Sequence, residues 1–203
     1  EDAKSSQNET IPQGTKADDY IIYWYCTGDD NYSEASGYLI VTIAKANLTD
    51  ITKVATIVEG RGNYDENTTY CATITPKVEM QVVSGLDKTY GNTIAVTVGT
   101  ATNLLPGRKD AGTQDVYFKL TNMENYNDYE GTTKVTVSAT ANPVIVSAID
   151  GLVYTGETQD LVTVANKQGK VYFSFTSIED AKSSQNETIP QGTKADDYII
   201  YWY

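Results

Sequence analysis

The sequence predicts an all-β fold in which Ig-like sandwich or β-grasp-like units repeat along an elongated array. Three observations lead to this fold class. A block of 25 residues occurs twice without a difference, short segments alternate between apolar and polar residues, and helix signals are few. Tyrosine occurs 16 times against 3 phenylalanines, and threonine and valine are frequent. These residues suit the half-exposed face of a β-sheet.

The identical block reads EDAKSSQNETIPQGTKADDYIIYWY and fills residues 1–25 and again residues 179–203. Diverged structural repeats do not keep every surface residue, so we expect a recent copy or an array with a period of 178 residues, the spacing of Glu1 and Glu179. The alternative is a duplication that completes a truncated domain. The sequence begins without Met and stops inside the strand-like YIIYWY, so neither end is expected to be a natural terminus.

Eleven short segments have the composition of β-strands, and several of them alternate polar and apolar residues. A period of two predicts a strand with one face in a core and one face in solvent. Clusters of Gly, Asn and Asp between the segments supply the turns. The predicted strands are 20–26, 38–43, 54–58, 69–75, 80–83, 93–98, 116–120, 134–137, 144–148, 161–164 and 171–175.

The charge balance argues against two kinds of partner. The chain has 27 acidic and 15 basic residues, which gives a formal net charge of −12. This charge repels phosphate groups, so we expect no nucleic-acid partner. No run of about 18 apolar residues is present, so we expect no membrane span in this segment.

Histidine is absent from the sequence. The commonest general acid–base residue and the commonest metal ligand are therefore both missing. No Ser-His-Asp, Cys-His, zinc or phosphate-loop pattern occurs either. We expect that the chain is not an enzyme and that it carries no cofactor.

Two acidic pairs are weak candidates for a metal site. Asp29 and Asp30 lie in a Gly-Asp-Asp-Asn turn, and Asp196 and Asp197 lie in the second copy of the repeated block. Their carboxylate oxygens are of the kind that Ca²⁺ prefers. A solvated turn is the favoured interpretation, because neither pair has the spacing of an EF-hand loop.

The two cysteines, Cys26 and Cys71, both lie in strand-like segments. In an extracellular setting they are candidates for one disulfide, and in a reducing setting they would be small buried apolar residues. Both alternatives stand, because a sequence does not give the distance between two Cα atoms.

The aromatic run Tyr23-Trp24-Tyr25 recurs at Tyr201-Trp202-Tyr203. On a strand, Tyr23 and Tyr25 share one face and Trp24 occupies the other. The favoured interpretation buries one of these faces in a core. The alternative is an exposed platform on which a sugar ring stacks.

A set of short motifs resembles the tandem Ig-like and MBG-type repeats of giant, adhesin-like bacterial cell-surface proteins. In that pattern a Tyr-x-Gly opens the unit, an Ile-Pro-x-Gly-Thr element precedes a strand, and a Gly-Asp-x-Asn-Tyr element precedes the last strand. The matching residues here are Tyr154, Gly156, Ile189, Pro190, Gly192, Thr193 and the segment 28–32. The sequence departs from the pattern at Asp196, where the family usually has Gly.

The resemblance implies a division of the chain into units. Residues 77–140 form one complete unit, residues 141–203 are the front half of a second unit, and residues 1–45 are the back half of such a unit. Residues 46–76 are left as a partial unit or a connector. The resemblance also implies that the units have an Ig-like fold and that they lie outside the cell, at its surface.

The leading functional hypothesis is structural: a segment of a bacterial surface stalk or fibre, whose partners are adjacent repeats or copies of itself. The complementary halves suggest that chains polymerise head to tail by completing split domains. The alternative is an adhesin or glycan-binding module that presents Tyr and Trp to host or environmental glycans or proteins.

Overall fold

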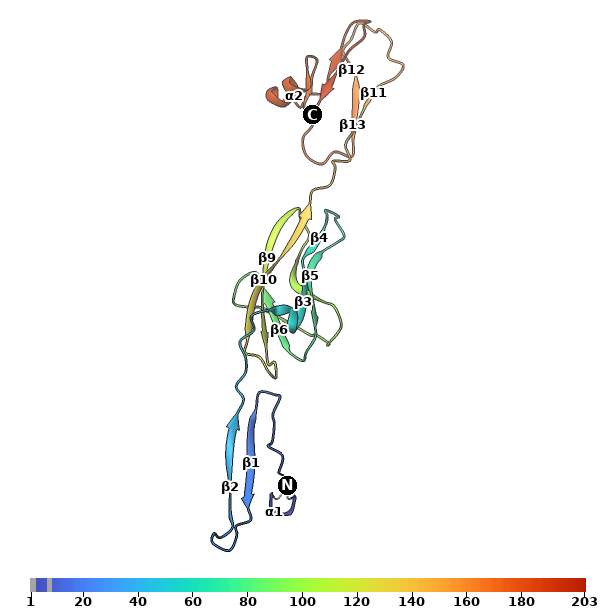
Figure 1. Ribbon diagram of the computed structural model, residues 1–203. Coiled ribbons are helices and arrows are strands. Elements are labelled where there is room, and N and C mark those ends of the chain that lie inside the picture. Colours follow the sequence, from blue (N-terminus) through green and yellow to red (C-terminus); the bar gives the residue numbers. More distant parts are fainter. Residues whose placement is uncertain (1–2, 7–8) are drawn as a thin grey trace. The chain divides into compact units, whose positions relative to one another are not determined.

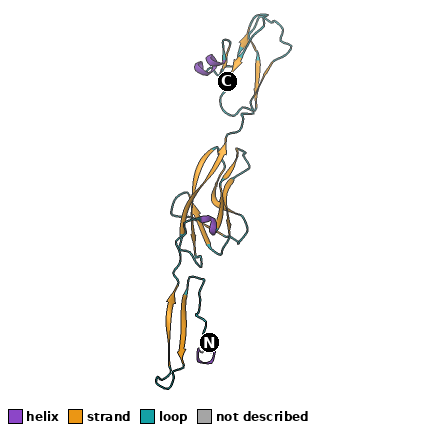
Figure 2. Cartoon of the chain, viewed as in Figure 1, coloured by secondary structure: helices purple, strands orange, loops and turns teal. Residues whose placement is uncertain are grey.

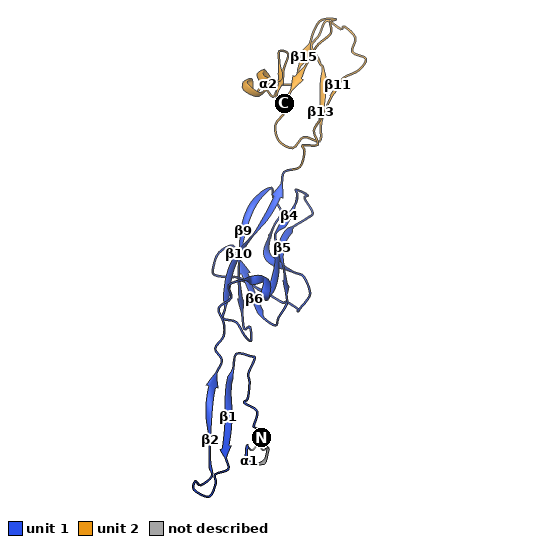
Figure 3. Ribbon diagram, in the orientation of Figure 1, with its two compact units in different colours: residues 1–139 blue, residues 140–203 orange. Residues whose placement is uncertain are grey.

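The computed structural model describes residues 3–6 and 9–203 and divides the chain into two compact units, Glu1–Ala139 and Thr140–Tyr203 (Figure 3). Strands dominate both units, and the helices are short (Figure 2). The all-β prediction is confirmed.

An antiparallel ribbon of two strands is the main feature of residues 3–45. A short helix, α1 (Ala3–Ser6), precedes strand β1 (Asp19–Cys26), which pairs along its whole length with β2 (Ala35–Thr42). In the connecting turn the Asp29 side chain accepts hydrogen bonds from the backbone N–H groups of Asn31 and Tyr32, at 2.8 and 2.9 Å. We call β1 and β2 the N-terminal ribbon.

Residues 46–139 form the central body, in which two sheets lie on either side of one core (Figure 1). The first sheet has the order β4-β10-β9-β6-β7, in which only the β4–β10 pair is parallel. The second has the order β3-β5-β8. The bounds are β3 Ala55–Val58, β4 Gly60–Asn63, β5 Tyr70–Pro76, β6 Gln81–Gly85, β7 Asn92–Ile94, β8 Thr102–Arg108, β9 Gly112–Thr121 and β10 Tyr129–Ser138, with a 3₁₀ turn at Ile51–Lys53 before β3.

The core of the central body is built by alternation along its strands. On β9, Val116, Phe118 and Leu120 are buried while the residues between them are at least partly exposed, and Val135 on β10 continues the same face. These side chains meet Ala72 and Ile74 of β5 and further buried residues of the second sheet. Burial of this apolar surface is what stabilises the body.

The division expected at residue 77 is not what the structure shows. Residues 46–76 supply β3, β4 and β5, and β5 is the central strand of the second sheet. The body needs both sheets to enclose its core, so residues 77–140 are not a complete unit alone. Residues 46–76 are part of the same body and not a connector. The boundary between the two compact units falls between Ala139 and Thr140.

The second unit, residues 140–203, has shorter strands and a smaller core. Three two-stranded antiparallel pairs are present, β11–β13, β12–β15 and β14–β16, together with helix α2. The buried core side chains are Val162, Val171 and Phe173. The bounds are β11 Ile145–Ala148, β12 Gln159–Asp160, β13 Val162–Ala165, β14 Phe173–Ser174, α2 Ile178–Ser184, β15 Gln191–Gly192 and β16 Tyr201–Trp202. We call this the C-terminal unit.

Candidate functional site

The two copies of the 25-residue block fold in the same way around one tyrosine. In the first copy the Tyr20 hydroxyl accepts a hydrogen bond from Lys16 N–H at 3.2 Å and donates one to the Lys16 carbonyl at 3.1 Å. In the second copy Tyr198 makes the same two bonds with Lys194, at the same distances. The local turn is therefore a property of the block and does not depend on its surroundings.

A second shared feature lies at the aromatic end of each copy. The Lys4 ammonium group sits 5.1 Å from the centre of the Tyr25 ring, and the Lys182 ammonium group sits 4.5 Å from the centre of the Tyr203 ring. A cation over an aromatic face is attracted by the ring quadrupole. Both ends of the block thus keep equivalent contacts in the two copies.

The surroundings of the two copies differ in a complementary way. The first copy has a strand partner, because β1 pairs with β2, but its Ile11 is 81 % exposed. The second copy has a core, because Ala181 is fully buried and Ile189 packs against the core side chains. No strand in the described part of the chain pairs with β16 except β14. Within the described residues, the second copy therefore has no counterpart of β2, and the first copy has no counterpart of the core around Ala181 and Ile189.

The N-terminal ribbon exposes apolar side chains on both faces. One face, which we call the inner face, carries Tyr20, Ile22 and Trp24 of β1 opposite Val41, Leu39 and Gly37 of β2. Trp24, Leu39 and Val41 are each between 44 and 46 % exposed. The other face carries Ile21, Tyr23, Tyr38 and Ile40, which are more exposed still. Isolated two-stranded ribbons are marginally stable in water, and a continuous apolar face is typical of a contact surface.

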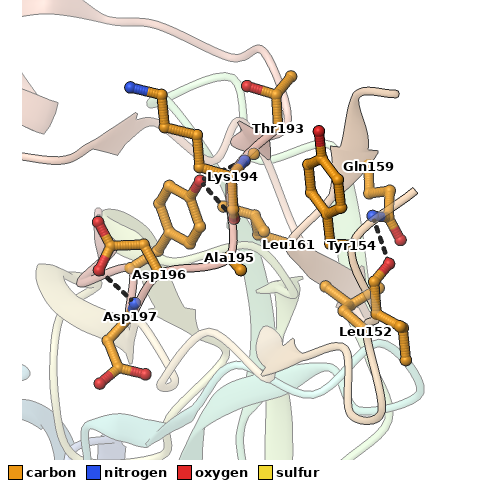
Figure 4. Close-up of a pocket in the computed structure, with 12 residues that line it drawn as sticks. Leu152, Tyr154, Gln159, Leu161, Thr193, Lys194, Ala195, Asp196 and Asp197 are labelled. Atoms are coloured by element: carbon orange, nitrogen blue, oxygen red, sulfur yellow. Dashed lines mark hydrogen bonds between the residues drawn. The ribbon is translucent and has the colours of Figure 1, made fainter. Parts of the chain in front are cut away.

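The C-terminal unit has a hollow beside β16 and beside the residues that precede this strand. One part has a volume of about 460 Å³ (Figure 4). Its lining residues are Leu152, Val153, Tyr154, Gln159, Leu161 and the run Gly192–Tyr198. A second part of about the same volume has a more apolar lining, made by Val146, Ala148, Ile149, Leu152, Leu161, Val162, Asp196, Asp197, Tyr198, Ile200 and Trp202. We call the two parts together the C-terminal hollow.

The equivalent glycines Gly14 and Gly192 each lie against the tyrosine of their own block. Beside Gly14 in the first copy lie the Tyr20 ring and the Cδ1 atom of Ile43, which is 3.0 Å from the position of an added Cβ. Beside Gly192 in the second copy the three nearest atoms all belong to Tyr198. In the first copy, Ile43 directly after β2 thus contacts the same place as the tyrosine.

An ionic cluster marks the turn end of the N-terminal ribbon. The Glu34 carboxylate accepts hydrogen bonds from the Tyr25 hydroxyl at 2.5 Å and from the Lys4 ammonium group at 3.1 Å. The bond from Tyr25, and then Lys4, hold the pKa of Glu34 below its ordinary value. The same carboxylate raises the pKa of Tyr25 and of Lys4 above their ordinary values. The charged form of Glu34 is thus the one that the ribbon favours.

The three aromatic residues predicted as contact residues lie on β1. Tyr23 and Trp24 are exposed, and Tyr25 is half-buried through its contact with Glu34. The Tyr23 ring lies 6.1 Å from that of Tyr38, its partner on β2. The expected core on one face of this strand is not formed by the described residues of the N-terminal part.

The acidic candidates for Ca²⁺ have turn-forming contacts. Asp29 closes the ribbon turn, and Asp30 beside it is exposed. The Asp196 carboxylate accepts a hydrogen bond from the backbone N–H of Asp197 at 2.9 Å. Within residues 3–6 and 9–203, no three Asp, Glu, Cys or His side chains gather as metal ligands. Asp29 and Asp196 thus each accept backbone hydrogen bonds within a turn.

Cys26 and Cys71 are free thiols in the structure, on β1 and β5 respectively. Cys26 is exposed and Cys71 is half-buried, and burial raises the pKa of the Cys71 thiol. A raised pKa keeps the thiol protonated and lowers its reactivity near neutral pH. The disulfide between them stays a prediction.

No protein-family model matches the chain, and no curated protein matches it either. Across the described residues, no helix combines the length and the apolar character that crossing a membrane requires.

Sequence reasoning missed three components of this site: Glu34, the inner-face residues of β2, and the C-terminal hollow. Leu39 and Val41 lie in the predicted strand 38–43, a mostly apolar run in which polar and apolar residues do not alternate, so its two faces could not be told apart. The lining of the hollow comes from segments far apart in the sequence, and no local pattern indicates that they meet.

Proposed function

We propose that this chain is a structural segment of an extracellular bacterial surface stalk or fibre. In this fibre, residues 140–203 and a copy of residues 26–45 together make one Ig-like unit. The observation that carries the proposal is the complementary state of the two identical blocks. Within the described residues, the first copy has β2 as its partner and no core, and the second copy has a core and no counterpart of β2.

The exposed surfaces support the same proposal. The inner face of the N-terminal ribbon is apolar, and no sheet of the described residues covers it, while the C-terminal hollow has a mixed lining that includes Leu161, Ile200 and Trp202. Burying apolar surface from both sides is favourable at roughly 25 cal/mol per Å². Units that each complete a neighbour form an array that can extend in one direction.

The resemblance of the motifs to MBG-type repeats gives the proposal its cellular setting, the outside of a bacterial cell. The net charge of −12 suits a surface protein that stays soluble at high local concentration. Adjacent repeats are then the main partners of each unit.

The test is a longer chain in which residues 26–45 are repeated after Tyr203. We expect the added segment to pair with β16 and to fill the C-terminal hollow. Amide hydrogen exchange should slow in β13 and β16, and the Trp202 indole should lose solvent exposure, measured by fluorescence quenching. Slower exchange reports stable strand pairing.

The matched control is the same longer chain with Asp in place of the added copies of Leu39 and Val41. It has the same length and cannot bury its inner face, so its exchange rates should equal those of the chain without the addition. If the unmodified addition also leaves exchange in β13 and β16 unchanged, residues 26–45 do not complete the unit and the proposal is wrong.

A second candidate function is favoured by the exposure of Tyr23 and Trp24. Large aromatic rings on a sheet face offer apolar area with a polar edge, which suits contact with a sugar ring. This reading makes the N-terminal ribbon an adhesin or glycan-binding surface. A glycan array probed with the whole chain and with Trp24→Ala tests it: binding that Trp24→Ala weakens supports the reading, and no binding by either chain rejects it.

A further inference from the structure

We propose that strand β2 of a second copy of this chain pairs with the free edge of β16 and closes the C-terminal hollow. The joint between two molecules is then a strand exchange. Strand β2 separates from β1 of its own chain and pairs with β16 of another chain, which has the same sequence as part of β1. This inference rests on the proposed function and adds to it the partner, the segment and the register.

Strand β16 has two edges, and β14 occupies only one of them. Tyr203 exchanges backbone hydrogen bonds with Tyr172 on the β14 side, at 2.9 and 3.0 Å. Backbone groups along a strand point to alternate edges, so Tyr201 also faces β14 while Ile200 and Trp202 face away from it. No strand of the described chain lies along that second edge.

In the first copy, β2 occupies the equivalent second edge. Ile43 N–H donates to the Asp18 carbonyl at 3.0 Å. By the same alternation, the residues of β1 that face β2 are Tyr20, Ile22 and Trp24. Their counterparts in the second copy are Tyr198, Ile200 and Trp202, the residues that face away from β14. One strand sequence can therefore hold β14 and β2 at the same time, on opposite edges.

The register of the joint follows from the pairing in the N-terminal ribbon. In the ribbon, Ile22 lies opposite Leu39 and Trp24 lies opposite Gly37. In the joint, Leu39 lies opposite Ile200 and Gly37 opposite Trp202. Trp24 packs so closely over Gly37 that an added Cβ would be 2.9 Å from the ring. Trp202 is 40 % exposed, so its ring is available for the same contact.

In the joint, the inner face of β2 would contact the C-terminal hollow. Opposite residues of paired strands point to the same face of the sheet. Leu39 and Val41 therefore point with Ile200 and Tyr198, both of which line the C-terminal hollow. Ile43 packs beside Gly14 in the ribbon, and the equivalent position is beside Gly192, in the part of the hollow shown in Figure 4.

The charges at the turn end agree with this register. Glu34 bonds Tyr25 and Lys4 in the ribbon. In the joint it would meet Tyr203 and Lys182, which are already stacked on each other in the same way as Tyr25 and Lys4. Because the two blocks are identical, the strand hydrogen bonds and this ionic contact are regained in the exchange. The burial of Leu39 and Val41 is added.

The experiment is a disulfide cross-link in the whole chain, with Cys26→Ser and Cys71→Ala as background. Ile40→Cys and Ile199→Cys are introduced together, because residues 40 and 199 lie opposite each other in the proposed register, on the face away from the hollow. Paired strands bring opposite Cα atoms within the range that a disulfide spans. Under oxidised glutathione we expect a ladder of cross-linked multimers on a non-reducing gel.

Two controls use the same background. Ile40→Cys with Ile21→Cys should cross-link within one chain, because these residues are partners in the ribbon. Ile40→Cys with Tyr203→Cys keeps the same face but is four residues out of register, and it should not form the ladder. A pair at 40 and 199 that gives only monomer, cross-linked or not, overturns the inference, as does an equal ladder from the out-of-register pair.

Single substitutions test the face that the joint buries. Leu39→Asp should weaken concentration-dependent association by at least about tenfold, whereas Ile40→Asp on the opposite face should leave it within about threefold. Both side chains are exposed in the ribbon, so neither change should unfold the chain. Equal effects of the two substitutions would overturn the inference.

The covalently lengthened chain described above separates the two proposals. If that chain gains protection in β16 while separate copies form no ladder, the units are complementary and the exchange between molecules is wrong. If it gains none, the proposed function itself is wrong.

Discussion

Two antiparallel ribbons in the first compact unit have the same design and opposite surroundings. In β9–β10 the Phe118 ring lies over Gly131 of the partner strand, and in β1–β2 the Trp24 ring lies over Gly37. Phe118 is buried in the core of the central body, while Trp24 is 44 % exposed. Strand pairing and aromatic-over-glycine packing are therefore local properties, and burial requires a second sheet. The N-terminal ribbon has the apolar side chains that a core requires, but no second sheet of the described chain covers them.

The largest expected difference between the ribbons is in the cost of removing the aromatic ring. Phe118→Ala should destabilise the central body by about 3–5 kcal/mol, because it leaves a cavity among buried side chains. Trp24→Ala should cost less than about 1 kcal/mol, because the exposed ring fills no closed space. Urea denaturation followed by far-UV circular dichroism measures both. A cost for Trp24→Ala close to that for Phe118→Ala would show that the two ribbons are equally buried.

A smaller difference is expected at the two glycines. Gly131→Val should cost about 1–3 kcal/mol, because an added Cβ falls 2.4 Å from the Phe118 ring, which the core holds in place. Gly37→Val should cost less, because the Trp24 ring can turn into solvent. Thermal unfolding of the two variants, with Ser36→Val as a neighbouring control, gives the comparison. A larger loss from Gly37→Val than from Gly131→Val would contradict it.

The smallest expected effect is a pH dependence confined to the N-terminal ribbon. The pKa of Glu34 is depressed in the folded ribbon, so its stabilising contribution is present above the ordinary value near 4.5. That contribution is lost as the pH falls through the depressed value. NMR signals of Tyr25 and Trp24 should shift in this acid range in the wild type and stay flat in Glu34→Gln. High salt should reduce the effect, because the cluster is exposed. A Glu34→Gln variant that titrates like the wild type would contradict it.

Local sequence patterns predicted the strands well because alternation is itself local. Each of the eleven predicted segments overlaps a strand, as 116–120 overlaps β9 and 20–26 overlaps β1. The missed strands lack such a pattern: β4 reads Gly-Arg-Gly-Asn, and β8 contains Pro106. Helix α2 was missed too, although Ser177 caps it by accepting from the N–H of Asp180 at 3.0 Å, a signal that the sequence contains.

The same local patterns did not predict which distant segments of the chain pack together. The resemblance to repeat units placed a division at residue 77, but pairing between distant strands, as of β5 with β8, unites residues on both sides of it. The candidate site has the same character, since Leu161, Gly192 and Ile200 meet only through the fold. Its strand component was predictable, and its hollow was not.

The identity of the two 25-residue blocks has a thermodynamic consequence. Two strands of the same sequence that compete for one position differ in free energy only through the chain attached to them. If the attached chain had the same effect on both strands, each strand would occupy the position half of the time. A substitution in one block that costs about 1.4 kcal/mol would shift this ratio about tenfold. Sequence differences between the two blocks would therefore favour one of them for the shared position. Because the blocks are identical, their sequences contribute no free-energy difference to this competition.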